Sequence, residues 1–106
     1  MKGYIYIYHV PNYNYKNDID GSFYLGASVI KEILEEIDES CYEEDIVVDY
    51  ISDKRDRIDI LKELIMEELK DYRIKKSYFY RMEKEKMIGV IERMVKGWPE
   101  DFKKKD

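Results

Sequence analysis

Short runs rich in β-branched and aromatic residues alternate along this chain with amphipathic runs of helical period. Residues 3–10 read GYIYIYHV, whereas residues 83–96 place their apolar side chains three and four positions apart. Such alternation within 106 residues predicts one domain of the α/β (α+β) class, with a single core. We expect a mixed sheet of three or four strands with about three helices packed on it. The expected strands are 3–10, 22–26, 45–52 and 73–82, and the expected helices are 29–39, 56–71 and 83–96.

The later strand signals differ in their patterns. Residues 45–52 (DIVVDYIS) form a nearly continuous apolar run, which is typical of a strand covered on both faces and predicts the central strand. Residues 73–82 (RIKKSYFYRM) alternate instead, which predicts a half-exposed edge strand. Its expected apolar side consists of Ile74, Tyr78, Tyr80 and Met82, and its expected polar side of Arg73, Lys75 and Arg81.

The two later helix signals each carry one apolar stripe, which we expect to face the core. Gly97 is a natural end for the last helix, so we expect a globular domain over 1–97 and a charged C-terminal tail over 98–106. The expected inward residues are Ile58, Leu61, Leu64, Ile65 and Leu69 on the first of these helices and Met87, Ile88, Ile91, Met94 and Val95 on the second.

Composition indicates the environment of the protein. A single cysteine cannot form an internal disulfide, and no segment resembles a signal peptide or a membrane helix. These observations predict a cytoplasmic protein without membrane contact. Charged residues make up 41% of the chain, and glutamine and threonine are absent. This combination is typical of proteins from hot environments and favours a thermophilic source, such as an archaeon or a virus of one.

Charge is divided unevenly between the two ends of the chain. Residues 1–71 contain 8 basic against 18 acidic residues, and residues 72–106 contain 11 against 6. We therefore expect an acidic helix face and a basic, tyrosine-bearing strand as two binding surfaces, either for a protein or for nucleic acid. The candidate binding residues are Glu32, Glu35, Glu36 and Glu39 on the acidic face, and Arg73, Lys75, Lys76, Tyr78, Tyr80 and Arg81 on the basic one.

Two tyrosine motifs lie near the N-terminus, Tyr6-Ile7-Tyr8 and Tyr24-Leu25-Gly26. They resemble, in this order, the two motifs that open a GIY-YIG nuclease domain. The resemblance implies a metal-dependent nuclease in which Tyr8 and Tyr24 lie beside the scissile phosphate. It also implies that Glu63, or else Glu67, binds the metal from the second helix.

The chain departs from that family at three points. The expected helix 29–39 lacks the arginine that would stabilise phosphate charge, and no asparagine follows Asn17. The loop between the two motifs is also longer than usual. These departures favour a catalytically degenerate, nucleic-acid-binding relative over an active nuclease.

Other chemistry is sparse. His9 has no evident partner nearby in the sequence, and Cys41 lies among acidic residues that would raise a thiol pKa. We expect no cofactor and no metal site.

The function we predict is therefore a small non-enzymatic binding protein, such as a virus- or mobile-element-encoded effector that docks on a host protein. We also expect it to form a homodimer. The alternative is the nuclease, or its degenerate relative.

Overall fold

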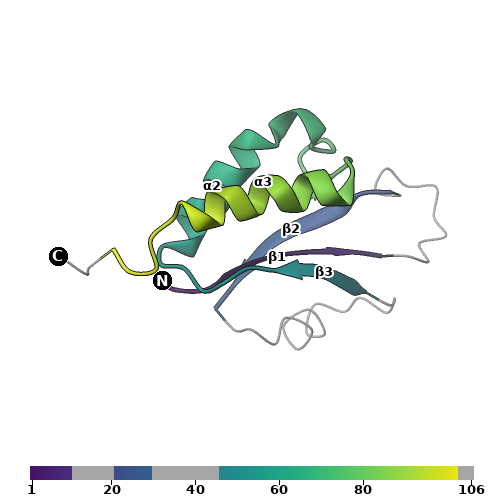
Figure 1. The fold of residues 1–106 in the computed structure, drawn as a ribbon. Helices are drawn as coiled ribbons and strands as arrows, with labels where there is room; N and C mark the ends of the chain where they lie inside the picture. Colours follow the sequence, from purple (N-terminus) through teal and green to yellow (C-terminus); the bar gives the residue numbers. More distant parts are fainter. Residues whose placement is uncertain (11–20, 30–45, 103–106) are drawn as a thin grey trace.

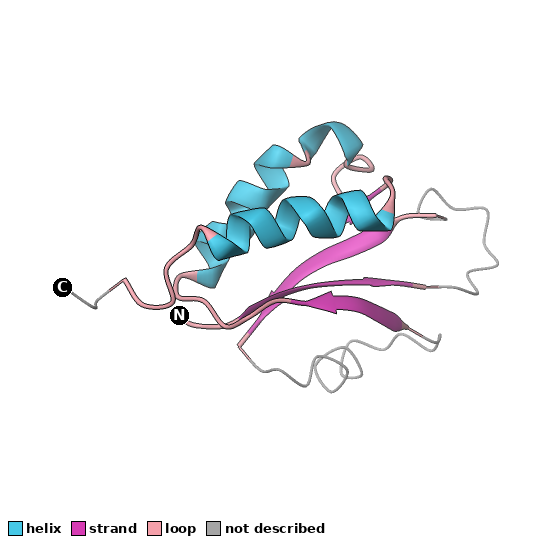
Figure 2. Cartoon of the chain, viewed as in Figure 1, coloured by secondary structure: helices cyan, strands magenta, loops and turns pink. Residues whose placement is uncertain are grey.

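A four-stranded sheet with two helices on one of its faces forms the structure, which is a computed structural model describing residues 1–10, 21–29 and 46–102 (Figures 1 and 2). The predicted α+β class is confirmed. Residues 30–39 of the helix predicted over 29–39 lie outside the described residues. The strands are β1 (Tyr4–His9), β2 (Phe23–Ser28), β3 (Val47–Ile51) and β4 (Phe79–Tyr80), and the helices are α2 (Ile58–Glu68), the short 3₁₀ helix η1 (Lys70–Tyr72) and α3 (Lys84–Lys96).

The order of strands corrects two predictions. Among the described residues the order is β3-β1-β2-β4 and every pairing is antiparallel. This part of the sheet is therefore not mixed, and β3 is its edge strand rather than its central one. Val47 and Ile51 of β3 are 43% and 36% exposed. The residues of β3 nevertheless form an apolar run, because the strand packs against apolar side chains on both faces of the sheet. Val48 packs on one face and Tyr50 on the other.

Residues 73–82 fold back on themselves instead of forming one strand, which corrects a third prediction. Arg73 forms an antiparallel bridge with Tyr80, and the Ile74 N–H donates to the Phe79 carbonyl. Lys75 takes a left-handed conformation (φ 49°) at the turn. Only the returning arm pairs with β2, as β4, so we call residues 72–81 the hairpin.

One core lies between the sheet and the two helices. It is built from alternate residues of the strands and from one stripe of each helix, as amphipathic patterning requires. Leu64 was predicted to face inward but is exposed, because it falls outside the stripe of α2 that contacts the sheet. The buried residues of this core are Ile5, Ile7 and Leu25; Ile58, Leu61, Ile65 and Leu69; Tyr80; and Met87, Ile91 and Val95.

Tyrosines dominate the opposite face of the sheet. Tyr6, Tyr8 and Tyr24 stack on one another there, and the rings of Tyr8 and Tyr24 are 4.6 Å apart between centroids. Gly26 is required beneath them, because a Cβ at this position would overlap the Tyr6 ring. Tyr6 pairs with Gly26 across β1 and β2, so the ring covers the glycine of the neighbouring strand.

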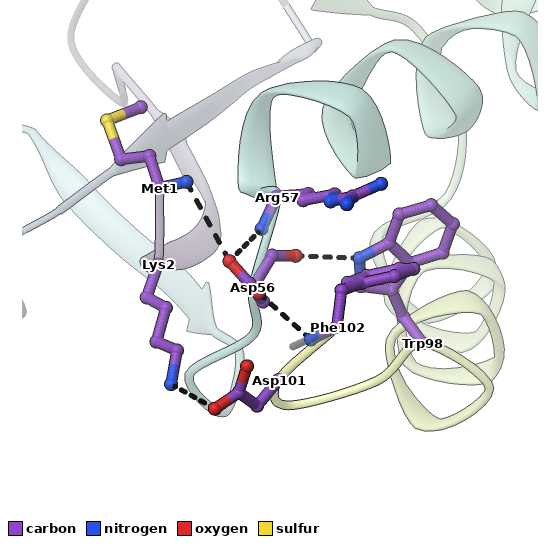
Figure 3. A network of polar contacts seen from close by, with 7 residues as sticks. All are labelled: Met1, Lys2, Asp56, Arg57, Trp98, Asp101 and Phe102. Carbon is purple, nitrogen blue, oxygen red and sulfur yellow. Dashed lines mark hydrogen bonds and ion pairs between the residues drawn. The ribbon is translucent and has the colours of Figure 1, made fainter. Parts of the chain in front are cut away.

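A polar network holds the start of α2 against both the N-terminal segment and the segment after α3 (Figure 3). Asp56 Oδ1 accepts from the Arg57 N–H, and Oδ2 accepts from the Phe102 N–H at 2.9 Å. The Asp56 carbonyl accepts from the Trp98 indole at 2.7 Å, and the Met1 amine lies 3.7 Å from the carboxylate. These contacts tie the start of α2 to both ends of the described chain.

Candidate functional site

A groove of about 470 Å³ runs between β2 and α2. Its apolar part comes from the end of β2 and from the side of α2 that faces it, including Ala27, Ile58 and Met66. Met1 lies at one end of the groove and Tyr78 of the hairpin at the other. The remaining lining residues are Ser28 and Val29 after β2, and Asp59, Lys62 and Glu63 on α2.

The outer edge of β2 is only partly paired. Phe23 and Tyr24 pair with β4, and the Leu25 N–H donates to the Tyr78 carbonyl at 2.9 Å. Backbone groups of a strand point alternately to its two neighbours, so Ala27 directs its N–H and carbonyl away from β1, as Leu25 does. Among the described residues, no hydrogen bond to these two groups of Ala27 is present. The groove therefore borders an open strand edge.

Lys62 is the cation of the groove. Its ammonium nitrogen lies 4.3 Å from the centroid of the Tyr78 ring, and the Arg73 guanidinium lies 5.7 Å from the same centroid. Within the described part of the chain, this ammonium makes no hydrogen bond and no ion pair. Burial lowers the pKa of Lys62, and the adjacent Glu63 carboxylate acts in the opposite direction. The groove thus holds a partly desolvated positive charge without a paired anion.

The structure brings together two of the three residues implied by the nuclease resemblance. Tyr8 and Tyr24 are direct partners across β1 and β2. Glu63, however, lies on α2, which packs against the face of the sheet opposite the stacked tyrosines. Tyr8 is also only 2% exposed. Among the described residues, no group of three or more metal-ligating side chains gathers anywhere.

The two predicted charged surfaces have different outcomes. Glu32, Glu35, Glu36 and Glu39 lie outside the described residues. On the hairpin, Lys75, Lys76 and Arg81 are exposed, whereas Arg73 is half-buried and donates to the Ser77 carbonyl at 2.6 Å. The two tyrosines of the hairpin differ, because Tyr78 is 42% exposed and Tyr80 is fully buried in the core. Tyr80 is therefore not a surface residue, and the predicted basic surface keeps only one of its two tyrosines exposed.

Sequence reasoning missed a charged cluster at the other end of the sheet. His9 Nδ1 lies 2.6 Å from Asp49 Oδ2, and Lys84 Nζ lies 3.8 Å from Asp49 Oδ1. The register between β1 and β3 shifts between Ile7 and Tyr8, which leaves Asp49 as the extra residue of a β-bulge. The sequence did contain a signal for this cluster, which was the carboxylate of Asp49 within an otherwise apolar strand. A charge that becomes buried in a strand requires partners of opposite charge or hydrogen-bond donors.

No protein-family model matches this chain, and neither the curated proteins nor the solved structures include a match to it. Within the described residues, no helix is long and apolar enough to cross a bilayer.

Proposed function

We propose that this chain is a small non-enzymatic binding protein that takes up an extended segment of a partner protein beside β2. The observation that carries the proposal is the open edge of β2 next to an apolar groove. In recognition by strand addition, main-chain hydrogen bonds supply affinity and pockets for alternate side chains supply specificity. The α2–β2 groove offers both elements on one side of the sheet.

The dimensions and lining of the groove support this function. Its volume of about 470 Å³ falls within the range of about 300–1,000 Å³ that is typical of ligand sites. Ala27 supplies one donor and one acceptor, and Ile58 and Met66 supply the apolar wall. Side chains at alternate positions of an added strand would point toward this wall, while the others would point to the far face.

A protein partner also fits the charge of the chain. The formal net charge is −5, which disfavours long nucleic acids because their phosphates would be repelled. If the chain is an effector of a virus or mobile element, the partner is a host protein.

The test is an NMR titration with a defined probe, a pool of N-acetylated random peptides of about eight residues, longer than a typical strand. We expect shift changes along β2 and α2, and slower hydrogen exchange at the Ala27 amide, because that amide becomes hydrogen-bonded. Val29→Lys should weaken binding, since residue 29 lines the groove and is half-exposed. Leu64→Lys, on the exposed side of α2, is the matched control. Shift changes confined to the tyrosine face of the sheet would overturn the proposal.

A metal-dependent nuclease is the second candidate, and one observation favours it. Tyr8 and Tyr24, which the family resemblance would place beside one phosphate, are paired across β1 and β2. Two observations argue against it. Tyr8 is buried, and Glu63 lies on α2, which covers the face of the sheet opposite the stacked tyrosines. We therefore rank it below peptide binding.

The nuclease candidate has its own assay. Cleavage of labelled DNA and RNA is measured with magnesium or manganese, for the wild type and for Tyr8→Phe and Tyr24→Phe. Metal-dependent cleavage that both substitutions abolish would establish the nuclease. Binding of nucleic acid without cleavage would indicate the degenerate relative.

A further inference from the structure

We infer that the α2–β2 groove recognises the free C-terminus of its partner, with the terminal carboxylate paired to the Lys62 ammonium. The inference rests on the proposed function and specifies its ligand as an extended, apolar C-terminal segment. Three features of the groove lead to it: the direction of β2, the block that the hairpin forms at one end, and the unpaired cation at that same end.

The direction of β2 sets the direction of an added strand. β2 runs from Phe23, next to β4, toward Ser28, next to the N-terminal segment. All pairings in this sheet are antiparallel, and antiparallel pairing is slightly more stable per residue than parallel pairing. A peptide added in this way enters at the Met1 end of the groove and runs toward Tyr78.

The hairpin closes the groove at the far end. The Tyr78 carbonyl already accepts the Leu25 N–H, so the edge of β2 is occupied from this point onward. A peptide that pairs with Ala27 cannot continue along the edge past Leu25. A chain that ends there satisfies this geometry without a turn away from the sheet.

The charge at the closed end favours a carboxylate. Lys62 stacks on the Tyr78 ring, so its ammonium lies where the last residue of an antiparallel peptide arrives. An anion at this position would supply the ion pair and hydrogen bond that the Lys62 ammonium does not form within the described residues. Parallel addition would place a peptide amine there instead, and the two positive charges would repel each other.

The experiment compares two peptide pools that differ in one group. Both are N-acetylated random peptides of about eight residues, longer than a typical strand, and one pool has free C-terminal acids while the other has C-terminal amides. Peptides selected from the acid pool are resynthesised in both forms, and their affinities are measured by fluorescence anisotropy. We expect each acid to bind about tenfold or more tightly than its amide, the usual effect of one hydrogen-bonded charge pair.

Lys62→Met removes the charge and retains an unbranched apolar chain. We expect it to abolish the preference for the acid, so that the acid and amide forms of one peptide bind with affinities within about twofold of each other, because the charge that distinguishes them is gone. Lys96→Met, at the exposed end of α3, is the matched control and should preserve the preference. Circular dichroism melting of each variant establishes that it is folded.

The outcomes separate this inference from the proposed function. Equal affinity of acid and amide, with shift changes still in the groove, would overturn C-terminal recognition and leave strand addition intact. The same holds if the preference survives in Lys62→Met. A failure of both pools to bind the wild type would overturn the proposed function itself, and the present inference with it.

Discussion

Tyr80 is the residue whose substitution should stabilise this protein. Its side chain is fully buried in the core, and its hydroxyl oxygen has no hydrogen-bond partner among the described residues. The ring packs between the sheet and the helices as part of the core cluster. Tyr80→Phe removes the unpaired hydroxyl and keeps the ring, so the packing of the core is retained.

The expected gain follows from the cost of burying a polar group without a partner. That cost is about 1–3 kcal/mol in mutational data. The gain from Tyr80→Phe is smaller than this cost if the phenyl ring does not fill the space left by the hydroxyl. We therefore expect the free energy of unfolding to rise by about 1 kcal/mol. For a domain of this size, the melting temperature should then rise by about 4–8 °C.

The pH dependence of stability gives an independent signature. Burial raises the pKa of the Tyr80 hydroxyl above its ordinary value. A group whose pKa is raised on folding contributes stability that is lost as the pH increases, because the unfolded chain ionises first. The wild type should therefore lose stability above about pH 10, and Tyr80→Phe should lose less. Burial also raises the pKa of Tyr50, so Tyr50→Phe serves as a comparison in the same pH range.

Urea unfolding followed by circular dichroism, at pH 7 and at pH 10.5, measures both effects. At pH 7 the tyrosine hydroxyl is neutral in both the folded and the unfolded protein. The difference in unfolding free energy between the wild type and Tyr80→Phe at this pH therefore measures the burial of the neutral hydroxyl alone. A loss of stability of about 1 kcal/mol in Tyr80→Phe at pH 7 would refute the reasoning, since it would mean that the hydroxyl forms a stabilising hydrogen bond.

Three further predictions concern the fold and the assembly. Gly26→Ala should destabilise the domain by about 1–3 kcal/mol in urea unfolding, because the new methyl group displaces the Tyr6 ring. Hydrogen bonds from the N–H groups of Phe102 and Arg57 lower the pKa of Asp56, so stability should fall as the pH decreases below about 4. Asp56→Asn should lower the melting temperature at pH 7 and reduce that acid dependence. If the predicted homodimer forms through opposite charges, its mass by light scattering should fall with added salt, whereas insensitivity to salt would indicate apolar pairing.

Local patterns in the sequence predicted the elements of this fold well. The alternation of Ile5 and Ile7 with tyrosines located β1, and the apolar stripes located α2 and α3 to within two or three residues. These features depend on side-chain periodicity, which can be read from a short window of residues. The reversal of the chain at Lys75 was missed because a lysine in the left-handed conformation carries no turn signature such as glycine or asparagine.

The candidate site could be predicted only in part, because it depends on how distant segments meet. Tyr78 was identified as an exposed tyrosine, and Glu63 as a residue of the second helix. Lys62 was not singled out, because its importance arises from its position over a ring sixteen residues later and beside the end of β2. The groove exists where β4 stops pairing with β2, and the length of a pairing is set by tertiary contacts rather than by local propensity.

The bulge at Asp49 affects how copies of this protein behave toward one another. A strand at the edge of a sheet is a template for uncontrolled pairing, and β3 presents two partly exposed apolar side chains along such an edge. An extra residue interrupts the regular spacing of its backbone groups, and the buried carboxylate would lose His9 and Lys84 if the strand straightened. A strand of another molecule therefore cannot form a regular ladder of backbone hydrogen bonds along the edge of β3. Fibre-like stacking of sheets needs two receptive edges on every copy, and the bulge protects one of them.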